Sequence, residues 1–310
     1  MRPTVFIPNF NGAERIARSL GGLRRQSREV AVVVVDNGSS DDSIELIGRQ
    51  FPEVGLIALE RNRGFGPALN AAVAARPDAD PVILLNDDAE PEARFVEALL
   101  EPFAPGVSSV AGVMTQEAAP ELIDSAGVVA DHTLMGFDYL HGEPLAAAFA
   151  AADPLGPTGG AALYRREAFE AVGGFDERMF LYYEDLDLAL RIAAGGGRCR
   201  LAAEARALHA YSASLGAASG AKYARTGWSR GYMLRRYGVM RDPTLAARAF
   251  ACEAAIGLGQ LLRDHTAAGI TGRLRGFRAG GGLPQREVGS APLLDIGARE
   301  VLSLRRRRRG

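Results

Sequence analysis

The first 85 residues alternate short apolar runs with longer amphipathic segments. The apolar runs predict four β-strands, at Thr4 to Ile7, Val30 to Val35, Val54 to Leu59 and Pro81 to Leu85. Helical patterns separate them, at Glu14 to Arg25, Asp41 to Gln50 and Pro67 to Ala75. Such alternation is typical of βαβ units, in which right-handed crossovers join parallel strands. The second run is apolar at every position, which indicates a strand covered on both faces. We therefore expect an α/β fold.

The pattern changes along the rest of the chain. From residue 107 to 208 it is mixed and rich in loops, and excursions at 117–120 and 142–157 are placed to face an acceptor. Two helical patterns follow, Ala221 to Tyr237 and Thr244 to Arg263, before a tail rich in glycine and arginine. We expect two domains: residues 1–217, an α/β domain, and residues 218–310, a basic helical extension suited to contact with a membrane surface or another copy of the chain.

The composition, 47% hydrophobic and 24% charged, is that of a globular protein. Cys199 and Cys252 are too few for a disulfide framework, which suits a reducing cytoplasm. The segment Met1 to Ile7 resembles a strand and lacks the apolar core of a secretory signal. The apolar stretch Ala249 to Leu262 is interrupted by two polar residues and is shorter than a bilayer span. We expect no membrane-spanning segment.

A net charge of −1 conceals an asymmetry. Residues 222–310 contain 18 Lys and Arg against 6 Asp and Glu, a net +12, whereas residues 1–221 contain 18 against 31, a net −13. The acidic part argues against nucleic acid as a ligand and suits a bound divalent cation. The basic tail, which ends in Arg305 to Arg309, suits anionic lipid headgroups. A solvated, disordered end is the open alternative.

Polar residues follow each predicted strand, where parallel sheets bind their ligands. Asp36 follows the second strand directly, and its carboxylate can accept a hydrogen bond from the ring N–H of uracil, thymine or guanine. The alternative is a helix N-cap cluster, which we favour for Ser39 and Ser40. After the third strand, the glycines and arginines of residues 61–66 open a helix in a way that suits phosphate, although a tight turn has the same composition.

Two acidic motifs carry the candidate chemistry. Asn86-Asp87-Asp88 stands at the end of the fourth strand, where a divalent ion bridging two phosphates needs oxygen ligands; a polar turn is the alternative. Glu184-Asp185 lies after an aromatic-rich segment, where a helical pattern begins. A carboxylate there suits a general base, and simple helix capping is the alternative.

These motifs, in this order, closely resemble the inverting family-2 glycosyltransferases over residues 3 to about 240, in particular the branch that contains rhamnosyltransferases. The resemblance implies a GT-A fold, a Rossmann-like nucleotide-binding domain with a mainly parallel mixed sheet flanked by helices, followed here by C-terminal helices. It also implies roles for individual residues. The catalytic pair is Asp185, the base, and Glu184; the nucleotide-binding residues are Pro8, Asn9, Asn11, Asp36, Asn62, Gly64 and Asp87; the metal ligands are Asp88 and His209; the residues near the donor sugar or acceptor are Gly159, Gly160 and Arg165.

The resemblance further implies Mn²⁺ or Mg²⁺ as the cofactor and a nucleoside-diphosphate sugar, dTDP-rhamnose or a UDP-sugar, as the donor. The acceptor would be a glycan or a lipid-linked molecule in bacterial cell-surface polysaccharide synthesis, at the cytoplasmic face of the membrane. Two alternatives stay open. A sugar nucleotidyltransferase would need basic residues directly after the first strand, and residues 9–14 contain none. A non-catalytic nucleotide-sugar-binding module would share the fold. His132, His141 and His265 have no comparable context, and Lys222, the only lysine, suggests no mechanism.

Overall fold

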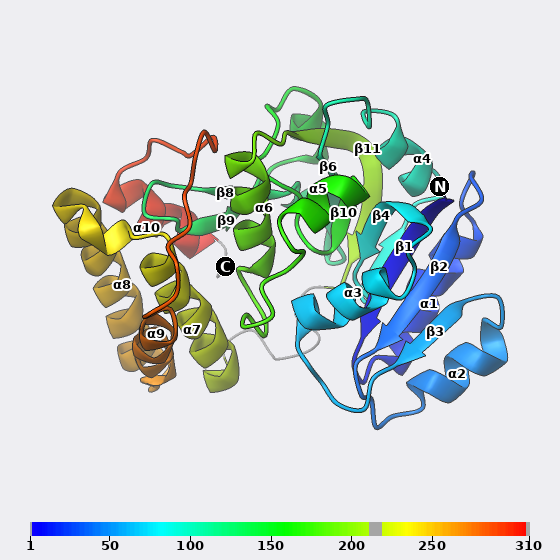
Figure 1. Cartoon of the computed structure of the whole chain (residues 1–310), viewed down its shortest axis with the longest axis horizontal. Helices are drawn as coiled ribbons and strands as arrows, with labels where there is room; N and C mark the ends of the chain where they lie inside the picture. Colours follow the sequence, from blue (N-terminus) through cyan, green and yellow to red (C-terminus); the bar gives the residue numbers. More distant parts are fainter. Residues whose placement is uncertain (1, 211–218, 308–310) are drawn as a thin grey trace.

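A nine-stranded mixed sheet forms the centre of the molecule in the computed structural model, which describes residues 2–210 and 219–307 (Figure 1). The strand order is β3-β2-β1-β4-β10-β6-β11-β5, and β7 pairs with β6. The strands of this sheet are β1 (Arg2–Asn9), β2 (Ala31–Asp36), β3 (Gly55–Ala58), β4 (Ala79–Leu85), β5 (Ala89–Pro91), β6 (Ser109–Gln116), β7 (Ala119–Ser125), β10 (Ala161–Tyr164) and β11 (Cys199–His209). A separate ribbon pairs β8 (Val128–Ala130) with β9 (Gly136–Asp138).

The four predicted strands are confirmed as β1 to β4, with ends within two residues of the predicted ones. They pair in parallel, and the register places Asn9 opposite Asp36 and Asp36 opposite Ala58. The carboxyl ends of these strands therefore meet at one edge of the sheet. Beyond β4 the pairing becomes mixed, because β10 runs antiparallel to both β4 and β6, whereas β6 and β11 are parallel. The expected mixed α/β sheet is confirmed.

Helices cover both faces of the sheet, because consecutive side chains of the central strands are apolar and point to opposite faces. Val5 and Ile7 of β1 face one core, which contains apolar residues of the first set of helices, and Phe6 faces the other. The first set is α1 (Ala13–Arg24), α2 (Ser43–Gln50) and α4 (Phe95–Leu100). The second set is α3 (Phe65–Ala74), α5 (Arg166–Ala171) and α6 (Glu184–Ala194).

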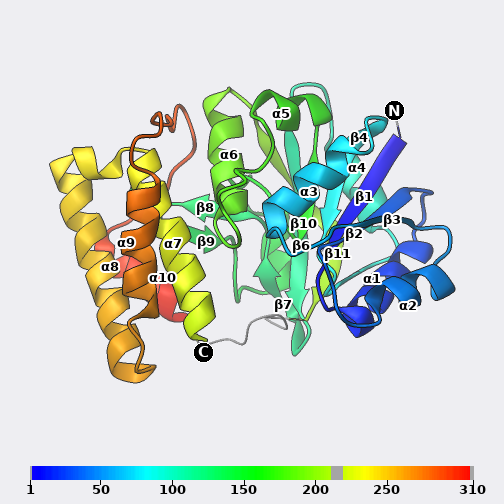
Figure 2. The ribbon, with the colours of Figure 1, turned by 60° about the horizontal axis from the view of Figure 1, so that its bottom comes forward.

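Four further helices lie side by side at one end of the molecule (Figures 1 and 2). They are α7 (Gly220–Arg236), α8 (Pro243–Arg263), α9 (Ala268–Ala279) and α10 (Ala298–Arg307); the short 3₁₀ turns are η1 (Leu145–Phe149) and η2 (Val239–Arg241). The sequence predicted α7 and α8 but gave α9 and α10 no helical pattern, so that expectation was wrong. The predicted domain boundary between residues 217 and 218 lies outside the described residues, and the division into two domains stays a prediction.

Close backbone packing explains why α9 forms in spite of its glycines. A Cβ atom added at Gly276 would lie 1.8 Å from the carbonyl oxygen of Trp228 on α7, and one at Gly272 would lie 2.3 Å from the carbonyl oxygen of Ala224. Glycines lower helix propensity, which hid this helix from the sequence pattern. They also allow two helices to approach closely enough for backbone contact, which only the folded pair reveals.

Buried ion pairs and a buried hydrogen bond fix α7 and its neighbours to one another and to α6. Asp187 of α6 accepts a hydrogen bond from the hydroxyl of Tyr237 at 2.9 Å and pairs with Arg286. Arg230 of α7, 1% exposed, pairs with Glu253 of α8 at 2.5 Å. Removal of one partner from such a pair leaves a buried charge without compensation. These contacts hold α7 and α8 in place beside the start of α6.

Helix α8 extends beyond the apolar stretch Ala249 to Leu262 that the sequence indicates. It has 21 residues and, by length and composition only, is long and apolar enough to cross a membrane. The core helix of a soluble protein passes the same test, so the expectation of no membrane-spanning segment stays a prediction.

Candidate active site

A cleft of about 1510 Å³ runs from the carboxyl ends of the parallel strands, past the start of α6, to α7 and α8. Eleven of the fourteen predicted site residues line it, although they are scattered over 200 residues of sequence. They are Pro8, Asn9, Asn62, Gly64, Asp87, Asp88, Gly159, Gly160, Glu184, Asp185 and His209. The remaining three are Asn11, Asp36 and Arg165. The fold therefore brings the three sequence motifs, the strand-end asparagines and acids, the Glu-Asp pair and the histidine, to one cavity.

Asp36 and Asn11 act within the chain in this structure. The Asp36 carboxylate is fully buried and accepts hydrogen bonds from Asn9 Nδ2 at 2.9 Å and from the Ser39 amide at 2.9 Å and hydroxyl at 2.6 Å. The Asn11 side-chain oxygen accepts from the Ser40 amide at 2.8 Å. Both side chains bind the loop after β2 and not the first turn of α2, so neither acts as a helix cap, and their contact with a nucleotide stays a prediction.

Arg165 lies apart from the cleft. Its guanidinium donates to the carbonyl oxygens of Val107 at 3.1 Å and Ala104 at 2.9 Å, and lies 4.3 Å from the centre of the Phe103 ring. These contacts hold the end of β10 against the loop before β6. The expected contact of Arg165 with the donor sugar or acceptor is therefore not supported by this geometry, because carbonyl groups of the loop before the neighbouring strand β6 already bind its guanidinium.

The loop before α3 positions the loop before α6. Gly64 has φ +96°, and a Cβ atom there would lie 2.4 Å from the Phe180 carbonyl oxygen. The Phe65 amide donates to that same oxygen at 2.9 Å. On the other side, Arg225 of α7 lies 4.1 Å from the centre of the Phe180 ring. The segment that carries the acidic pair is thus held between the loop before α3 and the C-terminal helices.

The acidic pair begins α6 after a strained turn. Tyr182 and Tyr183 have φ +72° and +69°, a region that costs free energy for residues other than glycine and occurs often at functional sites. Glu184 is buried, and its Oε2 has no hydrogen-bond partner among the described residues. Burial, with the charge of Asp185 beside it, raises the pKa of Glu184 well above its usual range. Asp185 accepts from the Leu186 amide at 2.7 Å and also lines the cleft.

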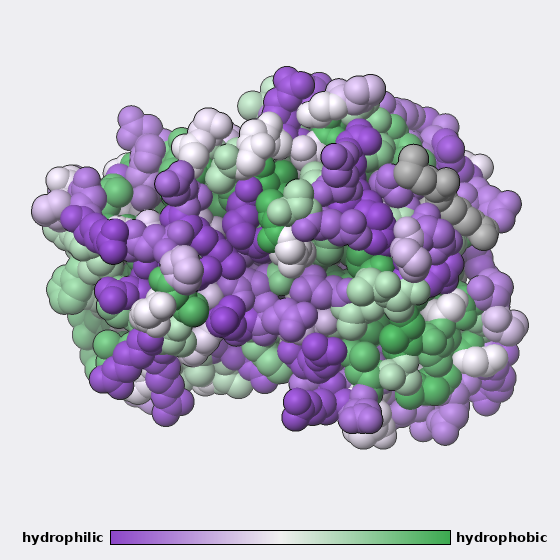
Figure 3. Space-filling model, viewed as in Figure 1, coloured by the Kyte–Doolittle hydropathy of each residue, from purple (hydrophilic) through white to green (hydrophobic). Residues whose placement is uncertain are grey.

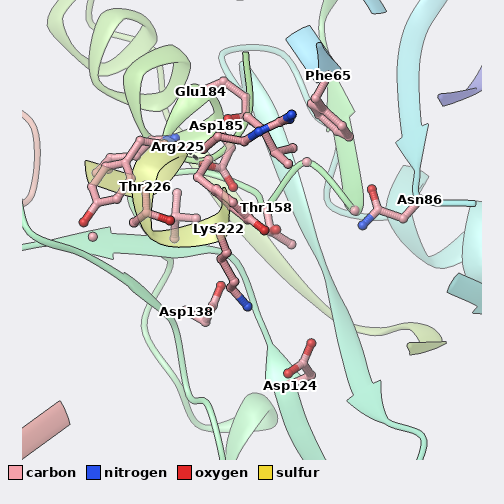
Figure 4. Close-up of a pocket in the computed structure, with 18 of the residues that line it drawn as sticks. Phe65, Asn86, Asp124, Asp138, Thr158, Glu184, Asp185, Lys222, Arg225 and Thr226 are labelled. Atoms are coloured by element: carbon pink, nitrogen blue, oxygen red, sulfur yellow. Dashed lines mark hydrogen bonds between the residues drawn. The ribbon is translucent and has the colours of Figure 1, made fainter. Parts of the chain in front are cut away.

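Two basic side chains from α7 line the cleft. Figure 4 shows Arg225 near Glu184 and Asp185, whereas the end of the Lys222 side chain lies near Asp138; Phe65 and Asn86 lie across the cavity. Sequence analysis assigned Lys222 no role, because a single lysine in a distant helix carries no motif. Only the packing of α7 in the folded chain places these two positive charges in the cleft.

The candidate metal ligands meet at the ends of β4 and β11. Asp88 Oδ1 lies 3.2 Å from His209 Nε2, and this buried oxygen has no hydrogen-bond partner among the described residues. The neighbouring Asp87 pairs with Arg15 at 3.0 Å. Burial and the charge of Asp88 raise the pKa of Asp87 to about 7, although Arg15 opposes the shift. The cluster thus concentrates two carboxylates and an imidazole where the cleft meets the strand ends.

Asp124 of β7 orients His209 and was not predicted. Its Oδ2 lies 2.7 Å from His209 Nδ1, and its Oδ1 lies 3.4 Å from Nδ1 of His141, a residue to which the sequence analysis assigned no role. Burial would lower the pKa of His209, but the hydrogen bond to Asp124 and the negative charge of Asp88 raise it to about 10. Nothing adjacent in the sequence links Asp124 to His209, because their strands pair separately with β6.

The residues present fit a divalent cation that also binds phosphate. A carboxylate oxygen without a partner and an imidazole nitrogen are ligands that Mn²⁺ accepts. Across residues 2–210 and 219–307, no three His, Cys, Asp or Glu side chains are arranged to hold an ion by themselves. Asp88 and His209 would therefore hold the ion only together with oxygen atoms of a bound diphosphate.

A Rossmann-like sheet, a cleft at its strand ends, and carboxylates at both the diphosphate end and the start of a helix define a glycosyltransferase of the GT-A fold. The family model for glycosyl transferase family 2 matches residues 4–173, more than half of the chain. The chain belongs to glycosyl transferase family 2. The predicted family and enzyme class are confirmed, and family membership favours them over a nucleotidyltransferase or a binding module.

Curated relatives include rhamnosyltransferases. The N-acetylglucosaminyl-diphospho-decaprenol L-rhamnosyltransferase of Mycobacterium tuberculosis is 29% identical over 240 residues, 69% of this chain and 77% of the relative. The O-antigen chain rhamnosyltransferase RfbN of Salmonella typhimurium is 25% identical over 221 residues, 68% of this chain and 67% of the relative. Among solved structures, the mannosyltransferase PcManGT of Pyrobaculum calidifontis, in complex with GDP-Man and Mn²⁺, has a TM-score of 0.53 at 20% identity, covering 90% of this chain and 86% of that one.

Proposed function

We propose that this chain transfers a sugar, rhamnose from dTDP-rhamnose or another sugar from a UDP-sugar, to a glycan or lipid-linked acceptor in the synthesis of a cell-surface polysaccharide. The observation that carries this proposal is the position of Glu184 and Asp185 at the start of α6, in the same cleft as Asp88 and His209. The names of the rhamnosyltransferase relatives support the sugar and the acceptor class.

The proposed reaction is a single in-line displacement with inversion. Asp185 accepts the proton of the acceptor hydroxyl as the hydroxyl oxygen attacks the anomeric carbon, and the bond from that carbon to the diphosphate breaks. Glu184, whose raised pKa favours the neutral acid, orients the acceptor without adding a second negative charge. Asp88 and His209 would hold the divalent ion, which neutralises the charge that develops on the leaving diphosphate. One base suffices, and no covalent nucleophile is needed.

Gly159 and Gly160 shape the wall where the donor sugar would lie. A Cβ atom at Gly159 would lie 2.8 Å from the Phe65 ring, and one at Gly160 would lie 2.9 Å from Asn86 Nδ2. Any side chain at these positions would displace groups that line the cleft. Contact with the donor sugar is therefore proposed for the backbone of these two residues.

The proposed location is the cytoplasm, at the inner face of the plasma membrane, because a lipid-linked acceptor is embedded there. The net charge of +12 over residues 222–310 supports attachment to anionic lipid.

Calorimetric titration with UDP-, dTDP- and GDP-sugars, each with Mn²⁺ and with a chelator, tests the proposal. We expect one donor class to bind in Mn²⁺ and to bind far more weakly in chelator, because the ion links Asp88 and His209 to the diphosphate. Transfer to a synthetic diphospholipid-linked N-acetylglucosamine, followed by mass spectrometry, then tests the reaction. A folded protein that binds no nucleotide sugar under either condition would refute the proposed function.

A further inference from the structure

The outer face of α8 is apolar along nearly its whole length. Seven apolar residues of α8 are exposed and, at 3.6 residues per turn, fall on one side of the helix: Ala247, Phe250, Ala251, Ala254, Leu258, Leu261 and Leu262. Phe250 is 71% exposed, Leu262 66% and Leu258 53%. Figure 3 shows hydrophobic residues along the left edge of the molecule, where α8 lies in Figure 1. Exposed apolar stripes of this extent indicate a binding surface.

Helix α9 extends this surface. Leu274 is 57% exposed and Ile270 37%. A Cβ atom at Gly257 of α8 would lie 2.9 Å from Ile270, so the two helices adjoin at this point. We call the seven α8 residues together with Ile270 and Leu274 the docking face. It joins two helices that the sequence separates by a turn.

The exposed charges of α8 and α9 are all positive. Arg263 ends α8, and Arg275 and Arg278 lie exposed on α9 beside Leu274. The single acidic residue of these two helices, Glu253, points inward and pairs with Arg230 and Arg273. An apolar stripe bordered by arginines, without exposed acidic residues, complements an anionic bilayer surface.

The inner contacts of α8 require it to lie along a bilayer and not through one. Glu253 is held by two arginines, and Arg248 pairs with buried Asp131 at 2.6 Å. A helix that crossed the bilayer would have to break these pairs and expose their charges to hydrocarbon, which is costly. A helix on the surface retains all of them.

We propose that the docking face binds the surface of an anionic lipid bilayer, with its apolar side chains at the boundary between headgroups and acyl chains and its arginines on the lipid phosphates. The purpose of this contact rests on the proposed function. The cleft is also lined by Ala255, Ile256 and Gly259 of α8, so an acceptor carried by a lipid would enter the cleft beside the membrane.

Flotation with vesicles tests the proposal, with phosphatidylcholine alone compared with a mixture containing phosphatidylglycerol. The test variants are F250S/L258S/L262S and R275Q/R278Q; the matched control is F149S, a 55% exposed aromatic on η1. We expect the wild-type chain and F149S to bind the anionic vesicles and to be released by salt. The triple variant should bind at least tenfold more weakly, because it loses most of the apolar anchor. The arginine variant should lose about tenfold or more and depend less on salt.

Three outcomes would overturn the proposal. In the first, the wild-type chain binds no anionic vesicles at low salt; in the second, the triple variant binds as well as the wild type. In the third, binding is lost only when the chain is truncated after Leu304, which would assign the contact to the arginine tail. Light scattering provides a fourth such outcome. If the wild-type chain is a dimer, the triple variant is a monomer and the wild type binds no vesicles, the docking face is assigned to a second copy of the chain. Donor binding is measured separately in solution. If no donor binds while vesicle binding is intact, the proposed function is refuted but the proposed docking face is not.

Discussion

The substitution Asp124→Asn tests how the histidine of the metal site is held. The carboxylate accepts from His209 Nδ1 at 2.7 Å and lies 3.4 Å from His141 Nδ1. Asparagine has the same size but only one acceptor oxygen, and its amide nitrogen is a donor. His141 keeps its contact with the Asp124 backbone carbonyl at 2.8 Å, but His209 loses the charged partner that fixes its orientation toward Asp88.

The structure indicates the size of this effect. Asp124 is 6% exposed, so water cannot readily replace the lost hydrogen bond. Partners that orient a metal-binding histidine typically contribute 10- to 100-fold to metal affinity, which corresponds to about 1.4–2.7 kcal/mol. We expect a loss in this range for Mn²⁺ in the presence of saturating nucleotide. Nucleotide affinity in chelator should change little, because Asp124 acts through the imidazole.

Calorimetric titration of Mn²⁺ into the nucleotide-bound protein measures the effect. Asp131→Asn is the matched control: it changes another fully buried carboxylate, bound to Thr133 and Arg248, that does not line the cleft. Thermal unfolding reports damage to the fold in both variants. Mn²⁺ affinity that is unchanged in folded Asp124→Asn, or reduced equally in Asp131→Asn, would refute the reasoning.

Three further predictions follow from the site and its supports. Asp185→Asn should bind donor normally but lower turnover by at least about a hundredfold, the usual contribution of a general base; near-normal transfer would exclude Asp185 as the base. Asp88→Ala and His209→Ala should each weaken nucleotide binding in Mn²⁺ but not in chelator, and unchanged calorimetric affinity in both would place the metal elsewhere. Gly276→Ala should lower the free energy of unfolding by about 1–3 kcal/mol, because the new methyl group meets a carbonyl oxygen of α7. Gly48→Ala, in open space on α2, should raise it by about 0.5–1 kcal/mol; equal urea midpoints for these two variants would contradict the packing argument.

The sequence alone predicted the parallel half of the sheet and the site motifs it carries. Strands such as Val30 to Val35 are apolar throughout, and the carboxyl ends of parallel strands share one edge, so Asn9 and Asn86 were expected near each other before any coordinates. Glu184 and Asp185 were recognisable because their helix begins where the aromatic segment ends. These features depend on residues that are close together in the sequence, so the sequence pattern is enough to predict them.

Tertiary structure decided what depends on contacts between distant segments. Asp124 and Lys222 reach the cleft only because β7 pairs beside β6 and α7 packs against α6. Arg165 leaves the cleft because carbonyl groups of a neighbouring loop bind it, and Asp36 is enclosed by its own loop. The glycines of α9 lower its helix propensity as an isolated segment. In the folded chain they allow the close contact with α7 that stabilises the helix. In each case the stabilising contact is made with residues far away in the sequence. The local sequence pattern holds no information about such a contact.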